Sequence, residues 1–356
     1  MNNIKKILAL LLALTMVLGL AACAAKEEAP AADAPAADAP AADAPAADAP
    51  AADEAADAEA PKCAFLIPGP ISDMSWCYNE YLGYEMVVEA GYEATYQENV
   101  TAEMLVDSVR TYASEGYNCI IIGTDANQED IIETMKDFPD TQVFIANCAY
   151  VTENVYPIFF ADEDQGFAMG VVAGLATKTN KVAYIAGIDF APLTNGGKGF
   201  EAGAKFVNPD CEVLVTIAGT TEDVAMLKET AKDLFESGYD VIAPNADQAG
   251  LGVMEAAAEV EGAIAIAGSE GMMSVAPANT ICAVNMSTFV GYYAAFMDYV
   301  NGTIPTEASK YGMAAGLVDL PIWSEEFPEP LTEEQLATLE AAYESYKNGE
   351  VTVDLG

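Results

Sequence analysis

The fold is decided by two stretches: Tyr112-Ala113-Ser114-Glu115-Gly116-Tyr117-Asn118-Cys119-Ile120 and Leu234-Phe235-Glu236-Ser237-Gly238-Tyr239-Asp240-Val241-Ile242. Each contains a helix end, a Gly-Tyr-polar turn and the start of a buried strand, and Gly91-Tyr92-Glu93 repeats the turn. Around them, short apolar runs alternate with amphipathic stretches, which indicates parallel sheet covered by helices on both faces. The repeat predicts two similar α/β lobes, although convergence of turn chemistry between αβ units is the alternative explanation.

The expected elements follow from this alternation. We expect strands at 64–67, 94–97, 119–122, 142–146, 156–160, 182–186, 212–217, 241–243, 263–267 and 280–283, and helices at 76–90, 102–114, 129–137, 163–177, 222–237 and 251–260. A capping box at Thr332 and Gln335 predicts a further helix that runs to about residue 348. Two doubly wound, Rossmann-like lobes would face each other with the carboxyl ends of their strands at a cleft, where such sheets bind ligands.

The composition excludes several kinds of chemistry. The 356 residues include 56 acidic and 14 basic residues and no histidine, for a net charge of −42. Without histidine there is no Ser-His-Asp triad, no imidazole base and no His-ligated metal. The acidity and the single arginine, Arg110, argue against nucleic acid and against electrostatic binding to an anionic membrane.

The cysteines give no sign of a metal site. Six follow Cys23 and none forms a CxxC pair: Cys63, Cys77, Cys119, Cys148, Cys211 and Cys282. Four lie in or beside apolar strands, where a buried thiol behaves as a small hydrophobe. We expect no metal, no cofactor and no disulfide framework, while the sequence leaves a single bridge open.

The N-terminal segment has the pattern of a secretion signal. Lys5 and Lys6 precede the apolar run 7–22, which ends in Leu20-Ala21-Ala22-Cys23 and resembles the lipobox of bacterial lipoproteins. An ordinary signal peptide with a chance cysteine is the alternative. We predict a signal peptide at 1–22, lipidation of Cys23, and a lipid-anchored location on the extracytoplasmic face of the cell membrane.

Residues 23–61 form a segment that we expect to be a disordered tether. After Cys23 they are Ala, Pro, Asp and Glu with one lysine, without the apolar area that offsets ordering entropy. This segment holds ten acidic residues and one lysine, a net −9, and the signal adds +2. The total of −42 therefore leaves −35 on residues 62–356, so the acidity belongs to the folded body.

Polar and aromatic residues at predicted strand ends are the candidate ligand-binding residues. Trp76, at the start of a helix, can stack on a flat ring, and Asp73 can accept hydrogen bonds from ring N–H groups. The alternative is that Trp76 is a packing residue and Asp73 a helix N-cap. The remaining candidates follow other strands, where they could equally be caps: Thr124, Asp125, Asn147, Phe190, Asn245, Asp247, Ser269 and Glu270.

Two motifs that suggest catalysis are incomplete. The stretch 192–199 resembles a phosphate loop, but Pro192 and Gly199 replace the required Gly and Ser/Thr. Ala267-Gly268-Ser269-Glu270-Gly271 resembles a nucleophile elbow, but Ser269 has no histidine base. We therefore expect a binding protein and not an enzyme.

The ordered series of motifs between Cys63 and about Leu320 resembles the basic-membrane-protein family of periplasmic-binding-protein-like lipoproteins, which includes purine nucleoside receptors. The similar stretches are 69–76, 96–100, 138–143, 170–174, 177–182 and 199–210. The resemblance implies a type I periplasmic-binding fold, a small-molecule ligand and an ABC permease as partners, Trp76 stacked on a purine, and Asp73 holding the base.

Two departures from the nucleoside receptors favour a free base or another flat heterocycle. Ala267 stands where they carry an acidic residue and Asn285 where they carry a lysine, and both of those residues hold the ribose. We expect an N-terminal lobe of residues 62–180 with about 286–308, and a C-terminal lobe of 181–285 with about 309–356. The expected function is ligand binding for an ABC importer; the alternative is a sensor or adhesin that binds another protein with the same fold.

Overall fold

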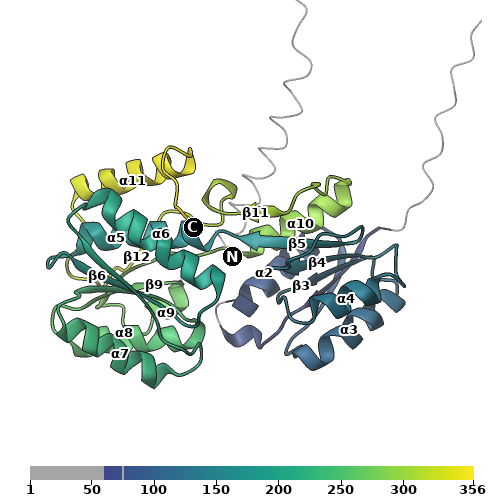
Figure 1. The fold of residues 1–356 in the computed structure, drawn as a ribbon, viewed down its shortest axis with the longest axis horizontal. Coiled ribbons are helices and arrows are strands. Elements are labelled where there is room, and N and C mark those ends of the chain that lie inside the picture. Colours follow the sequence, from purple (N-terminus) through teal and green to yellow (C-terminus); the bar gives the residue numbers. More distant parts are fainter. Residues whose placement is uncertain (1–59, 74–75) are drawn as a thin grey trace, which may run out of the picture. The chain divides into compact units, whose positions relative to one another are not determined.

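The computed structural model describes residues 60–73 and 76–356, which contain two six-stranded sheets (Figure 1). This confirms the two α/β lobes that the repeated turn predicts. The predictions for Cys23, the signal peptide and the tether lie outside the described residues, apart from positions 60 and 61. Within the described ranges, no helix has the length and apolarity needed to cross a bilayer.

The first sheet has the strand order β11-β5-β4-β3-β1-β2, and its neighbours all pair in parallel. Its strands are β1 (Lys62–Leu66), β2 (Glu93–Gln97), β3 (Cys119–Ile122), β4 (Gln142–Ala146), β5 (Val155–Phe160) and β11 (Ser309–Tyr311). Its helices are α2 (Trp76–Glu89), α3 (Ala102–Ser114), α4 (Gln128–Met135) and α10 (Phe289–Asn301).

Helices cover both faces of the first sheet, which is why its strands are apolar throughout. Cys63 and Phe65 of β1 pack with α2 and α10, whereas Ala64 and Leu66 point to the opposite face and pack with α3 and α4. Figure 1 shows α3 and α4 together on one side of these strands. Alternate residues of a strand therefore contribute to two separate hydrophobic cores, one on each face of the sheet.

The second sheet has the order β12-β10-β9-β8-β6-β7 and is parallel except for β12. Its strands are β6 (Lys181–Ala186), β7 (Glu212–Ile217), β8 (Val241–Asn245), β9 (Ile264–Ala267), β10 (Thr280–Ala283) and β12 (Ile322–Trp323). Its helices are α5 (Asp162–Ala176), α6 (Ala191–Val207), α7 (Val224–Glu236), α8 (Leu251–Glu259), α9 (Glu270–Met273) and α11 (Glu333–Lys347). Short 3₁₀ helices lie at Ile71–Asp73, Asp247–Gly250 and Met313–Ala315.

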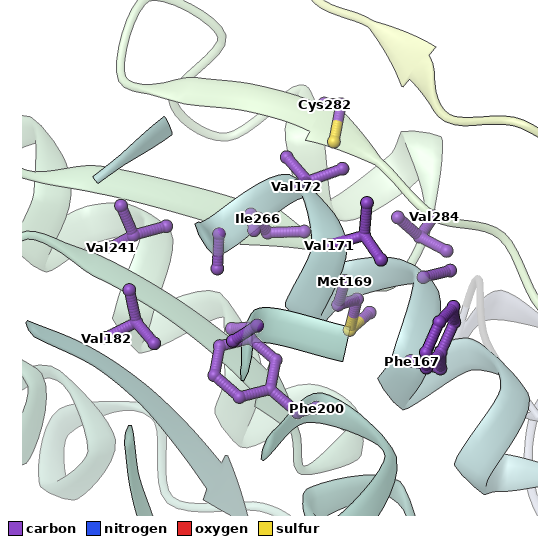
Figure 2. Packing of buried hydrophobic residues seen from close by; sticks show 14 of the residues in the cluster. Phe167, Met169, Val171, Val172, Val182, Phe200, Val241, Ile266, Cys282 and Val284 are labelled. Atoms are coloured by element: carbon purple, nitrogen blue, oxygen red, sulfur yellow. The ribbon is translucent and has the colours of Figure 1, made fainter. Parts of the chain in front are cut away.

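Helices α5 and α6 pack together unusually closely on one face of the second sheet. A Cβ at Gly170 would overlap the carbonyl oxygen of Phe200, and one at Gly203 would overlap that of Phe167. Figure 2 shows Phe167 and Phe200 in this layer with Val182, Val241 and Ile266 of the strands. The glycines let the two backbones approach, and this approach closes the core.

The packing of α5 bears on where the lobes divide. The expected boundary at residue 180 assigns α5 to the first lobe, but its buried residues pack with β6, β8 and α6. Strand β11, expected in the second lobe, pairs instead with β5 in the first sheet. We therefore propose that the first crossover between the lobes lies near Ala161, where β5 ends and α5 begins.

The helix ends follow the predicted turn chemistry. Gly91, Gly116 and Gly238 have φ values of 93°, 85° and 93°, which confirms the left-handed residues expected after these helices. Thr332 and Gln335 form the predicted capping box at the start of α11. The six cysteines of the described part are buried and free, with no disulfide between them.

Candidate functional site

A cavity of about 360 Å³ lies at the carboxyl ends of strands from both sheets, within the size range of small-molecule sites. From the first sheet it receives the residues that follow β1, β3 and β4, and from the second those that follow β6, β8 and β9. Parallel strands leave unpaired backbone groups and loop side chains at these ends, which is where doubly wound sheets bind ligands.

Trp76 lies on the wall of this cavity and is fixed on three sides. Its indole Nε1 donates a hydrogen bond of 2.7 Å to the carbonyl oxygen of Gly123. Its ring meets Phe160 edge-on, with centroids 5.4 Å apart, and lies 6.3 Å from the ring of Tyr292. Trp76 is therefore both a packing residue and a cavity residue, since its partly buried ring still lines the open space.

Asp73 lies at the start of α2 and acts there as a cap. Its carboxylate accepts hydrogen bonds from the backbone amides of Cys77, at 2.8 Å, and Tyr78, at 3.0 Å. It is not among the described residues that line the cavity. Its charge does reach the site, because it is one cause of the raised pKa of Asp247.

Most of the other candidate residues come together on the cavity wall. Those that line it are Thr124, Asp125, Asn147, Phe190, Asn245, Asp247 and Ser269. Ser269 also caps α9 by accepting a hydrogen bond from the amide of Met272 at 3.3 Å. Glu270 is not among the lining residues, and its backbone amide donates to Oδ1 of Asn285.

The sequence analysis missed several lining residues: Asn79, Asp162, Gln165, Thr221 and Thr288. Asp162 lies two residues after the end of β5. The other candidates were chosen because they follow strand ends, so the same criterion could have found Asp162. Asn79 and Gln165 lie inside helices, where the sequence gives no sign that they face a cavity. Gln165 is also engaged within the protein, since its Nε2 donates to the Val284 carbonyl at 2.8 Å.

The cavity is acidic. Its described lining residues include Asp125, Asp162 and Asp247 but neither lysine nor arginine. Burial raises the pKa of Asp162 to about 7, and the charge of Glu163 adds to this, while Asn245 and Lys310 oppose it. Burial, and secondly the charge of Asp73, also raise the pKa of Asp247.

The charges of the lining residues bear on which ligands the cavity can hold. A phosphate or carboxylate would meet carboxylates without a compensating cation among the described residues, whereas ring N–H and amino groups would meet acceptors. The same described residues hold no cluster of three or more acidic, cysteine or histidine side chains placed to bind a metal ion. The site is therefore suited to a neutral or cationic ligand that is rich in hydrogen-bond donors.

Residues 60–354 match the family model described as "ABC transporter substrate-binding protein PnrA-like". The chain is 26% identical over 268 residues to a purine-binding protein of Brucella abortus, covering 74% of this chain and 75% of that protein. It is 28% identical over 190 residues to the transcriptional activator protein med of Bacillus subtilis, covering 52% and 58%.

The chain spans about half the length of the first curated relatives that it matches. Among solved structures, an ABC transporter solute-binding protein from Conexibacter woesei superposes with a TM-score of 0.70 at 20% identity, covering 83% of this chain and 99% of that one. At this identity the likeness shows the fold, and it confirms the predicted type I periplasmic-binding architecture.

Proposed function

Since the chain belongs to the family of PnrA-like ABC transporter substrate-binding proteins, we propose that it captures a purine base or nucleoside for an ABC importer. The observation that carries this proposal is Trp76, an anchored indole on the wall of a cavity of suitable size. Indole faces stack on flat heterocycles, and an indole held in place loses little entropy when the ligand arrives.

The cavity offers a second aromatic group from the other sheet. Phe190 directly precedes α6, is 36% exposed and lines the cavity. A planar ligand between Trp76 and Phe190 would contact both lobes at once. Binding to both lobes is what allows a ligand to favour one arrangement of a two-lobed protein over another.

The polar groups around the cavity support a base more than a nucleoside. Asp125, Asp247 and Asn245 can accept hydrogen bonds from ring N–H and amino groups. Ala267 is fully buried, and the Asn285 side chain already accepts a hydrogen bond from the amide of Glu270. These two positions therefore offer a ribose neither the carboxylate nor the lysine that nucleoside receptors have there.

The wider role follows from the family. We propose binding without turnover, docking on an ABC permease, and attachment at the extracytoplasmic face through a lipid on Cys23. The comparisons do not favour the sensor or adhesin alternative, since the family model describes transporter components. A DNA-directed role is disfavoured by the net charge of −42 and the single arginine.

The test is calorimetric titration of the wild-type protein and the variant Trp76→Ala with adenine, guanine, hypoxanthine and their nucleosides. Stacking on an aromatic side chain is worth about 1–3 kcal/mol per base, so the affinity of Trp76→Ala should fall roughly 10- to 100-fold. Trp323→Phe, which changes the other tryptophan in β12, is the matched control and should bind as the wild type does. An unchanged Kd in Trp76→Ala would remove Trp76 from the site.

A further inference from the structure

Glu80 is a buried acid that lies directly behind the cavity wall. It follows Trp76 by four residues on α2, so the two side chains lie on the same face of the helix. Its exposure is 0%, and neither carboxyl oxygen has a hydrogen-bond partner among the described residues. Such groups are uncommon because burial of an unpartnered polar group costs stability, so this one requires an explanation.

Glu80 packs against Gly123, the residue whose carbonyl oxygen anchors Trp76. Oε2 of Glu80 is so close to Gly123 that a Cβ there would overlap it. The carbonyl oxygen of Gly123 accepts the hydrogen bond from the indole N–H of Trp76. The backbone amide of Gly123 donates a long hydrogen bond of 3.4 Å to the Leu66 carbonyl. The position of the Gly123 peptide, and with it the indole, thus depends on what occupies the space of the Glu80 side chain.

The surroundings of Glu80 disfavour a charged carboxylate. The titratable groups that face it are Cys63 of β1, Cys77 of α2 and Tyr292 of α10, and none of them is a cation. Burial raises the pKa of Glu80 well above its usual range, and the nearby backbone of Gly123 opposes this in part, although it makes no hydrogen bond of normal geometry with the carboxyl group. The hydroxyl of Tyr292 is also buried without a partner among the described residues.

We infer that Glu80 is the positioning residue that sets the backbone at Gly123 and thereby the orientation of Trp76 toward the ligand. The inference rests on the proposed function for its effect on binding, but its effect on Trp76 stands on the contacts alone. An apolar side chain of similar size would fill the space at lower desolvation cost. It would provide neither the planar carboxyl face nor the polar atoms that now lie against the peptide.

The test compares Glu80→Gln with Glu80→Met. Gln keeps the planar, neutral, polar end of the side chain, whereas Met keeps the volume and removes the polarity. The variants are made in a Trp323→Phe background, where Trp76 is the sole tryptophan of the chain, so its emission reports directly on the indole. Glu85→Gln and Glu85→Met, at a partly exposed glutamate of α2 that bonds to Tyr81, are the matched controls.

We expect Glu80→Gln to keep the Trp76 emission and to bind adenine within about twofold of wild type. Glu80→Met should fold at least as stably, shift the Trp76 emission and weaken adenine binding roughly tenfold or more. The Glu85 variants should change neither quantity. A role in packing alone would leave emission and Kd of Glu80→Met unchanged, and that result overturns the inference.

Two other outcomes also test the role of Glu80 and the proposed function. Equal losses in Glu80→Gln and Glu80→Met would show that the planar, polar end of the side chain does not set the indole, which overturns the inference. If no purine binds the wild-type protein, the proposed function fails. The Trp76 emission of the ligand-free variants still decides the role of Glu80.

Discussion

The carboxyl group of Asp162 makes stability depend on pH in a direction that can be derived. Its pKa is about 7 in the folded protein, chiefly because of burial, against 3.8 for an ordinary aspartate. Between these values the unfolded chain has released the proton and the folded protein retains it. The stability contributed by this proton is complete at acid pH and is lost as the pH rises through about 7.

The magnitude follows from the same difference. Each pH unit in this interval is worth about 1.4 kcal/mol, so Asp162 should remove about 2 kcal/mol between pH 5.5 and pH 7. For a folded body of residues 62–356, that corresponds to a melting temperature lower by about 3 °C. The side chain in Asp162→Asn stays neutral and can still accept a hydrogen bond from Asn245, so the variant should not lose this stability as the pH rises.

The assay is thermal unfolding of the wild type and Asp162→Asn at about pH 5.5 and about pH 8. From the lower pH to the higher, the difference in melting temperature between the two proteins should change by about 3 °C in favour of Asp162→Asn. Glu80, Asp164 and Asp247 also have raised pKa values, but they are common to both proteins and cancel in the difference.

Asp189→Asn is the control, because Asp189 is an exposed carboxylate next to the cavity residue Ile188. Its melting temperature is measured at the same two pH values, so that the loss of one exposed carboxylate is measured separately from the loss of the buried one. A gap between Asp162→Asn and wild type that is the same at both pH values would refute the reasoning.

Three further predictions concern the scaffold. Gly203→Ala should lower the free energy of unfolding by about 1–3 kcal/mol, because its Cβ meets the Phe167 carbonyl; denaturant unfolding with no shift in midpoint would contradict the close α5–α6 packing. Thr332→Ala removes the capping box of α11 and should cost about 1 kcal/mol in the same assay, whereas a neutral result would mean that tertiary contacts alone hold this end. Asp240→Ala leaves three donors of residues 177–179 without their carboxylate and should cost about 2 kcal/mol; a melting temperature equal to wild type would count against this link.

The fold was largely predictable because most of its strands are short apolar runs that can be recognised one at a time in the sequence. Runs such as 119–122 are buried on both faces, and the glycines at 116 and 238 mark the turns that lead into them. Helix α6 was not predicted, because Gly196, Gly197 and Gly199 have low helix propensity and were considered as a phosphate loop. Its packing against α5 overrides that propensity.

The two shortest strands were not predicted, for a different reason. Strand β11 has three residues and β12 has two, too few to produce a periodic pattern. Their pairing with β5 and β10 depends on contacts between segments far apart in the sequence. The local sequence pattern does not indicate such pairing. The lobe boundaries depend on these pairings, so they were also hard to predict.

For the site, the strand-end rule was a good guide but an incomplete one. It placed Thr124, Asn245 and Ser269 near one another, since the carboxyl ends of parallel strands meet at one edge. It did not reveal Glu80, because a glutamate in an amphipathic helix is expected to face solvent.

The central claim is that the cavity binds an uncharged purine, and the most direct measurement is calorimetric titration of the wild-type protein with adenine, adenosine and adenosine monophosphate at low salt. We predict saturable binding to one site, with the base tightest, the nucleoside weaker and the nucleotide weakest, because the cavity carboxylates oppose the phosphate. Tighter binding of the nucleotide than of the base, or no heat of binding from any purine tried, would contradict the account.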